Sequence, residues 1–238
     1  MLITHESFKP KNIRYGFLTK KISGSTHRYL KHQDNYENNN KLASKVFGAE
    51  QIAVVEQKHT NKVIITNDYN NYCIADAQVS TKANIALGVL TADCVPILLC
   101  DDEARIISSV HSGWRGARSD IIKNTIEEMQ KLGAKNITAI IGPCIQQDSY
   151  EVCDNFYQDF ISESSNNKQF FIPGKKEAHH MFDLPSYVKH KLSHSSVDQI
   201  LDIEHNTYDN EEDFFSFRRT THNPESQMGS LISVIMLK

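Results

Sequence analysis

Three short apolar runs follow one another in the middle of the chain, at residues 85–90, 95–100 and 106–110. Each is far shorter than the roughly 18–20 apolar residues that a membrane-crossing helix needs. Continuous apolar runs of this length, bounded by polar residues, are typical of strands that are buried on both faces. The sequence therefore predicts a central sheet that is covered on both sides.

A long amphipathic helix is predicted to follow this sheet. Apolar residues recur at helical spacing between Ile121 and Leu132, with Ser119 as the N-cap and Gly133 at the end. Further helices are expected at residues 41–47, ended by Gly48, and at 150–161 and 184–192. Further strands are expected at residues 51–57, 62–66, 137–141 and 229–237.

The organisation of the chain indicates one domain, residues 1–238, of α/β class (mixed α+β). We find no internal repeat and no linker rich in Gly, Pro or Ser, and the first 50 residues read as mostly irregular. The formal charge of −3, from 26 basic and 29 acidic residues, argues against binding nucleic acid by bulk positive charge. The sequence gives no indication of the oligomeric state.

The location is predicted to be cytoplasmic, with no membrane partner. The start of the chain lacks the basic segment and apolar run of a secretory signal. The five cysteines are an odd number without a Cys-x-x-Cys pair, which favours free thiols.

Reactive residues stand where predicted strands end, in residues 57–59, 91–94 and 110–116. Among them, His59, Cys94 and His111 form a ligand set that suits catalytic zinc with an open fourth position. The same residues suit a Cys nucleophile with a His base. A buried Cys beside two hydrogen-bonded histidines is the third interpretation.

Seven segments carry a resemblance to a known family. They are residues 57–59, 75–81, 91–101, 110–116, 141–145, 150–152 and 214–219. In their order and content they resemble the YfiH family of laccase-domain proteins, also labelled polyphenol oxidases. The resemblance spans about residues 13–237.

The resemblance implies zinc held by His59, Cys94 and His111, and a fold of layered sheets flanked by helices, related to the catalytic domain of cytotoxic necrotizing factor. It implies phosphorolysis of adenosine, inosine, guanosine and methylthioadenosine, and deamination of adenosine. Purine nucleosides and phosphate are thus the expected partners. Copper is a possible but adventitious occupant, since none of the 11 histidines forms a His-x-His pair.

The chemistry assigns further candidate roles. Zinc lowers the pKa of a bound water to about 7, which suits deamination. Phosphorolysis needs an anion site, for which Arg115 is the first candidate, with Arg218 and Arg219 behind it. Pairing of each Arg with a structural carboxylate is the alternative. Asp93 either orients a ligand histidine, acts as the acid–base group, or caps a local turn.

Other motifs are interpreted as structural. Trp114 is expected to pack rather than to stack on a purine, and Cys144 to be a small buried residue. The remaining cysteines are read as non-catalytic. The pairs His190/His194 and His179/His180 are expected on the surface or in loops.

Four segments depart from the family pattern. An Arg and a Gly-Gly pair are replaced in residues 20–23, and a Ser-Leu-Asn-Leu-Gly-like stretch is missing from residues 26–33. Asn206-Thr207 stands for Cys-Thr, and Ser226-Gln227 for Gly-Arg. These changes bear on phosphorolysis and on the substrate, while the metal trio is intact.

Two alternative functions compete with the nucleoside enzyme. One is a cysteine hydrolase or amidase acting on peptidoglycan precursors, with Cys94 attacking and His111 as base. The other is a metal-binding editing factor that docks to a cell-wall ligase without turnover.

Overall fold

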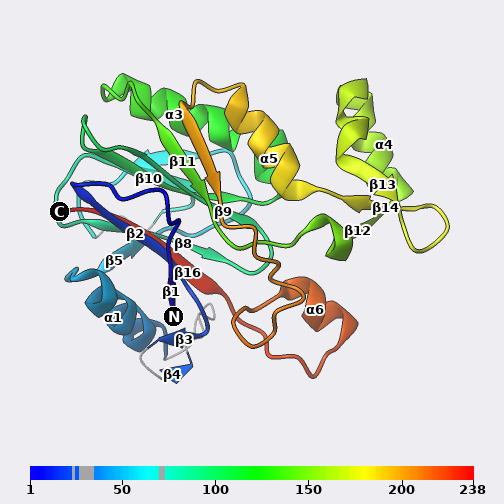
Figure 1. Ribbon diagram of the computed structural model, residues 1–238, viewed down its shortest axis with the longest axis horizontal. Helices are drawn as coiled ribbons and strands as arrows, with labels where there is room; N and C mark the ends of the chain where they lie inside the picture. Colours follow the sequence, from blue (N-terminus) through cyan, green and yellow to red (C-terminus); the bar gives the residue numbers. More distant parts are fainter. Residues whose placement is uncertain (23–24, 27–34, 70–72) are drawn as a thin grey trace.

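Two large sheets lie face to face in the computed structural model, which describes residues 1–22, 25–26, 35–69 and 73–238. The first has five strands, and helix α1 (Asn35–Phe47) lies on its side away from the second sheet (Figure 1). Its strand order is β1 (Leu2–Ile3), β2 (Ile13–Leu18), β16 (Leu231–Leu237), β8 (Ala86–Thr91) and β5 (Ile52–Val54). Only β5 and β8 pair in parallel among these neighbours.

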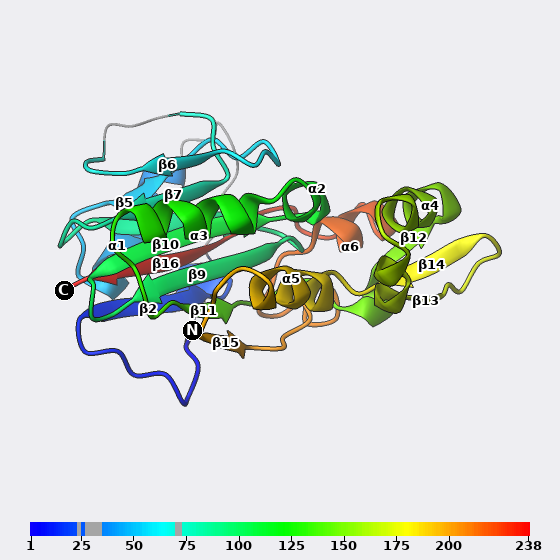
Figure 2. The same ribbon diagram turned by 90° about the horizontal axis from the view of Figure 1, so that it is seen from above.

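The second sheet has six strands and contains the central apolar runs. Its order is β15 (Gln199–Asp202), β11 (Thr138–Ile141), β9 (Val95–Asp101), β10 (Ile106–Ser112), β7 (Ala77–Ser80) and β6 (Val63–Ile65). The outer face of this sheet is covered by α2 (Trp114–Arg118), α3 (Ile121–Lys131) and α5 (Leu184–Ser193) (Figure 2).

Side chains that alternate between two covered faces explain why β9 is apolar from Val95 to Cys100. Val95, Ile97 and Leu99 pack with the helices α3 and α5, whereas Leu98 and Cys100 pack against the first sheet. A strand buried on both faces has no solvent side, so it needs no polar alternation. The layers therefore run helix, sheet, sheet, helix, and the expected class of layered sheets flanked by helices is confirmed.

A smaller lobe extends from one end of the sandwich (Figure 1). It holds the three-stranded sheet β12 (Glu151–Cys153), β14 (His179–Phe182) and β13 (Phe171–Pro173), with helix α4 (Asp154–Glu163). The 3₁₀ turns η1 (Gln147–Ser149) and η2 (Ser165–Phe170) flank it, and β3 (Lys21–Ile22) pairs with β4 (Ser25–Thr26) elsewhere. Helix α6 (Phe217–His222) lies between the sandwich and the lobe (Figure 2).

Most predicted elements are confirmed. The three central runs form β8, β9 and β10, and the helices predicted at 41–47, before Gly133 and at 184–192 are present. The strands expected around residues 51–57, 62–66, 137–141 and 229–237 are also present, with shorter bounds. Gly48 and Gly133 follow their helices with φ of 66° and 106°, the left-handed conformation that suits glycine there.

Three local predictions are wrong. Ser119 ends α2 and bonds back to the carbonyl of Arg115, so Asp120 precedes α3 instead. Residues 150–153 form η1's end and β12 rather than helix, because they pair with β14. His179 and His180 lie in that strand rather than in a loop.

The first 50 residues are more regular than expected. They include β2, which lies between β1 and β16 in the first sheet, and α1 begins earlier than predicted. Most of the stretch at 26–33 lies outside the described residues. None of the described helices has the length and apolar character needed to cross a bilayer.

Gly142 is predicted to be essential for stability. A Cβ at this position lies 2.1 Å from the ring of Phe17, which is buried between the sheets. Gly142→Ala is therefore expected to lower the free energy of unfolding by about 1–3 kcal/mol through overpacking. Thermal unfolding measures this loss of stability. Gly116→Ala is the control, because the nearest atoms to a Cβ at position 116 lie 3.4 Å away, which is close to ordinary contact. Equal melting temperatures for the two variants contradict the prediction.

Candidate functional site

The three predicted ligands meet at one end of the sandwich. His59 lies in the segment after β5, Cys94 in the short connection that crosses from β8 to β9, and His111 in β10. Their donor atoms all lie within 4.8 Å of one another, and Cys94 Sγ is 3.7 Å from His59 Nε2. The tertiary fold thus assembles one donor group from residues 52 positions apart in the chain (111 − 59).

Asp76 holds both histidines in place and was not predicted as a site residue. Its Oδ1 accepts hydrogen bonds from His59 N at 3.0 Å and from the ring Nδ1 of His111 at 2.7 Å. Its Oδ2 accepts from the main chain of Lys58 and from both the N–H and hydroxyl of Thr60. With Nδ1–H bonded to Asp76, Nε2 is the ring nitrogen of His111 left to bind a metal ion, and it offers a lone pair when the imidazole is neutral.

Two more contacts fix the same loops. The amide of Gln57 donates to the carbonyl of Leu90 and accepts from its N–H, so the His59 segment is tied to β8. Gly113 lies beneath the trio, where a Cβ would be 2.9 Å from Cys94 Sγ and 2.9 Å from His59 Cδ2. The absence of a side chain there leaves space for the ligand side chains.

The electrostatics favour an ionised thiol beside a charged imidazole. Burial raises the pKa of the Cys94 thiol, but the charge and hydrogen bond of His111 and the contact with His59 lower it to about 6. Burial lowers the pKa of His111, but the Cys94 thiolate and Asp76 together raise it above its ordinary range. The hydrogen bonds to His111 and Thr60 outweigh burial and hold the pKa of Asp76 well below its usual range.

The donor set fits a zinc ion. Two imidazole nitrogens and a thiolate are zinc ligands, and three protein ligands leave a position for a further group. Cys94 is half-buried and His59 exposed, so the trio is open on one side. Among the described residues, the structure has no second group of three potential metal ligands.

Asp93 joins the Cys94 turn to helix α6. It adopts a left-handed conformation (φ 84°), and its carboxylate accepts from the hydroxyls of Thr207 at 2.7 Å and Ser216 at 2.9 Å. It also accepts from the main-chain N–H of Arg218 at 2.6 Å. These contacts agree with the capping interpretation, while the carboxylate that bonds to the ring of His111 is that of Asp76. Burial raises the pKa of Asp93 against these hydrogen bonds.

The two candidate anion-binding arginines are oriented by aromatic rings. The guanidinium of Arg115 lies 4.8 Å from the centroid of the Trp114 ring, and that of Arg218 lies 5.0 Å from the Tyr150 ring. Phe156 stands between these rings, at 5.0 Å from Trp114 and 6.5 Å from Tyr150. Within the described part of the chain neither arginine forms an ion pair with a carboxylate, which leaves their charge available to an anion.

Arg219 has a structural role. It is buried and donates to three main-chain carbonyls, those of Thr207, Tyr208 and Phe214. Arg218 gives one N–H to the carbonyl of Glu151 at 2.6 Å and keeps its other donors.

The remaining sequence predictions concern packing. Trp114 packs edge-on against Phe156 and belongs to the core between sheet and helices, as expected. Cys144 is fully buried, and burial raises the pKa of its thiol. His190 is half-buried and His194 exposed on one side of α5, with ring centroids 4.2 Å apart.

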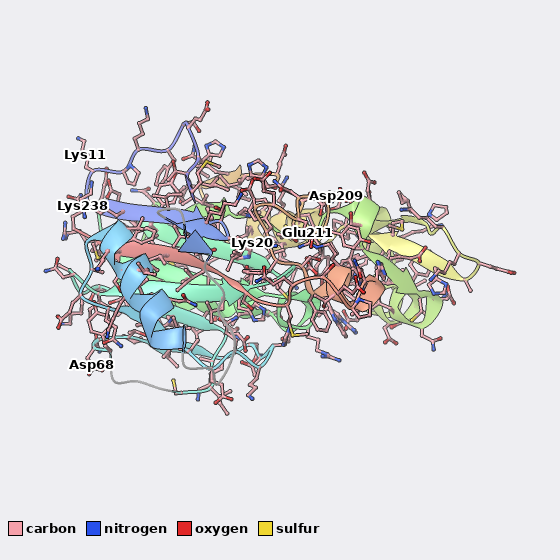
Figure 3. The ribbon with its side chains drawn as sticks, turned by 90° about the horizontal axis from the view of Figure 1, so that it is seen from below. Lys11, Lys20, Asp68, Asp209, Glu211 and Lys238 are labelled. Carbon is pink, nitrogen blue, oxygen red and sulfur yellow. The ribbon has the colours of Figure 1, made fainter. Side chains whose placement is uncertain are left out.

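Two departures from the family pattern have structural consequences. Thr207 donates to Asp93, and Asn206 donates to Ser149 and Asp209 in the same loop. Lys20, in the altered basic loop, donates a hydrogen bond from its Nζ to the main-chain carbonyl of Glu211 at 2.7 Å; Figure 3 labels both residues.

The thiol of Cys94 is expected to be reactive at acidic pH in chelator-treated protein. Because its pKa is lowered to about 6, its iodoacetamide rate should reach half its maximum near that pH, against about 8.5 for an ordinary thiol. The measurement uses a variant with Cys73 and Cys153 replaced by Ser, since the other two cysteines are buried. A midpoint near 8.5 would show that the His111 contact does not stabilise the thiolate.

The fold and the site define a layered α/β protein with a candidate metal centre where its two sheets meet. The family model described as multi-copper polyphenol oxidoreductase laccase matches residues 24–238. The chain belongs to this family, the YfiH family of laccase-domain proteins, and the resemblance drawn from the seven sequence segments is confirmed.

Relatives of this chain carry two enzyme names. A purine nucleoside phosphorylase of Rickettsia prowazekii (strain Madrid E) is 38% identical over 234 residues, covering 96% of this chain and 98% of the relative. An adenosine deaminase from an unknown prokaryotic organism is 37% identical over 150 residues, 60% of this chain and 56% of that protein. The crystal structure of a Neisseria meningitidis DUF152 protein superposes with a TM-score of 0.87 at 25% identity, covering 100% of this chain and 99% of that chain.

Proposed function

We propose that the protein is a purine nucleoside phosphorylase that uses a zinc ion held by His59, Cys94 and His111. The observation that carries the proposal is the trio with two arginines linked to it. Arg115 stands two residues after Gly113, which packs against Cys94 and His59, and Arg218 N donates to Asp93, the residue before Cys94. Neither arginine is paired to a carboxylate in the described part of the chain. The near full-length similarity to a purine nucleoside phosphorylase supports it. The expected substrates are adenosine, inosine, guanosine and methylthioadenosine.

The chain's own groups position the reactants. Phosphate binds to Arg115 and Arg218, whose guanidinium forks match its oxygens. The Arg115 guanidinium packs on the ring of Trp114 and the Arg218 guanidinium on the ring of Tyr150, so the two arginines lose little side-chain freedom when the anion binds. A phosphate oxygen then forms a bond to C1′, the bond from C1′ to the purine nitrogen breaks, and its electron pair leaves with the base.

The metal centre accounts for a second activity, the hydrolytic deamination of adenosine. When bound, zinc supplies a Lewis acid and lowers the pKa of a water ligand to about 7. Asp76 fixes the His111 tautomer, and Gly113 leaves the space the ligands need. The similarity to a protein named adenosine deaminase supports this activity. Copper is a weaker proposal, because the described residues offer one trio rather than several histidine-rich centres.

Chromatography of reaction products tests the proposal. The purified protein is incubated with adenosine, inosine or methylthioadenosine, each with and without phosphate. Phosphate-dependent release of the free base is the expected result, and phosphate-independent inosine from adenosine identifies deamination. If a zinc-loaded protein releases neither product from any of the three nucleosides, the proposed function is wrong.

A cysteine hydrolase acting on peptidoglycan precursors is the second candidate. One observation favours it: Cys94, His111 and Asp76 form a Cys–His–Asp series in which the carboxylate bonds to the far ring nitrogen. This function predicts turnover of a muropeptide that survives removal of the metal and stops when Cys94 is alkylated. Loss of all turnover on chelation, restored by zinc, excludes it.

A further inference from the structure

Tyr150 lies beside Arg218 and close enough to Cys94, Asp93 and Arg115 to interact with their charges, and no role above uses its hydroxyl. It ends the 3₁₀ turn η1, and its carbonyl accepts from Phe182 N at 2.9 Å, which ties it to β14. Its neighbour Glu151 accepts from the Arg218 side chain, and Arg218 N bonds to Asp93, the residue before Cys94. Tyr150 is therefore linked to the Cys94 turn through one arginine.

The ring of Tyr150 is held on more than one side. Its centroid lies 5.8 Å from that of Phe182 and 6.5 Å from that of Phe156, while the Arg218 guanidinium lies 5.0 Å away. A ring packed in this way keeps its hydroxyl in one direction at little entropic cost on binding.

The hydroxyl is free to bind a ligand. The Tyr150 side chain is partly buried, but its hydroxyl forms no hydrogen bond within the described part of the chain and is not one of the fully buried unpaired polar atoms, so it is accessible. The charged groups that act on it are Cys94, Arg218, Asp93 and Arg115. Burial and the Cys94 charge raise the pKa of Tyr150, so the phenol keeps its proton and is a donor at neutral pH.

We propose that the Tyr150 hydroxyl is a third donor of the anion site, binding a phosphate oxygen between Arg115 and Arg218. A neutral donor between two cations suits an oxyanion and offers nothing comparable to an uncharged nucleoside. This inference rests on the proposed phosphorolysis only for its kinetic test. The phosphate-binding test does not depend on that proposed function.

Phosphate binding by zinc-loaded protein, measured by calorimetry without nucleoside, tests this inference. Tyr150→Phe is expected to weaken the Kd for inorganic phosphate by about tenfold or more, since a hydrogen bond to a charged group is lost. In turnover assays the KM for phosphate should rise by a similar factor. The KM for inosine and the zinc content should stay within about twofold of the wild type.

Tyr157→Phe is the matched control, because Tyr157 belongs to the same lobe but stacks on His180 at 4.1 Å. It is expected to leave phosphate binding unchanged. If Tyr150→Phe leaves the phosphate Kd unchanged, or weakens inosine binding instead, the inference is overturned. If the wild type binds phosphate with the expected Tyr150 dependence but turns over no nucleoside, the inference holds and the proposed phosphorolysis fails.

Discussion

Cys94→Ala is expected to reduce phosphorolysis by about 10³-fold or more, because a metal centre supplies several kcal/mol of transition-state stabilisation. The zinc content should fall from about one ion per chain to a small fraction, since two histidines alone hold zinc weakly. The fold should persist, because Cys94 is half-buried in a connection rather than part of a core cluster. Metal analysis, turnover and circular dichroism of the same preparation measure the three effects.

Cys153→Ala is the matched control for this substitution. Cys153 is exposed at the start of α4 and lies outside the donor trio. It should keep both zinc and activity. A Cys94→Ala protein that retains full zinc and turnover would contradict the assignment of Cys94 as a ligand, whatever the substrate.

Asp76→Asn is expected to lower zinc affinity by about 10–100-fold, the usual effect of losing a carboxylate behind a ligating histidine. The amide of this variant has one oxygen that accepts hydrogen bonds and one nitrogen that does not, whereas both oxygens of the Asp76 carboxylate accept. In one orientation of the amide its nitrogen faces the three donors of Lys58 and Thr60, and in the other orientation its nitrogen faces Nδ1 of His111. Competition with a chromophoric chelator measures the affinity, and the melting temperature is recorded beside it.

Asp101→Asn separates metal binding from stability. Asp101 also accepts from four main-chain N–H groups, those of Glu103, Ala104, Lys135 and Asn136, but at the end of β9 away from the trio. Both variants should melt at lower temperature, and only Asp76→Asn should lose zinc affinity. Equal affinities in the two variants would assign Asp76 a structural role alone.

Local patterns were sufficient for the elements that depend on nearby residues. The central strands and α3 follow from the apolar pattern, because burial of a strand on both faces leaves a continuous apolar run and burial of one helix face leaves apolar residues at helical spacing. The strand at 13–18 and the 150–153 segment were mispredicted for the opposite reason. Their conformation depends on pairing with β16 and β14, more than 20 residues away in the chain.

The candidate site divides in the same way. His59, Cys94 and His111 were found from their chemistry at strand ends, and motif order identified the family. Asp76 and Tyr150 lie within two of the seven segments that resemble the family, but the sequence predicts no role for either. An Asp before a strand and a Tyr before a short strand are common, and nothing in their spacing reveals which side chain they face.

The sequence by itself determined which segments are buried, which residue types carry reactivity, and which family the chain belongs to. Only the tertiary structure decided that Asp76 bonds to both histidines, that Asp93 joins the Cys94 turn to α6, and that Tyr150 lies beside Arg218. The physical reason is the connection from β8 to β9, which passes from one sheet to the other. That crossing brings distant loops to one end of the sandwich, and such long-range contacts leave no periodic pattern in the chain.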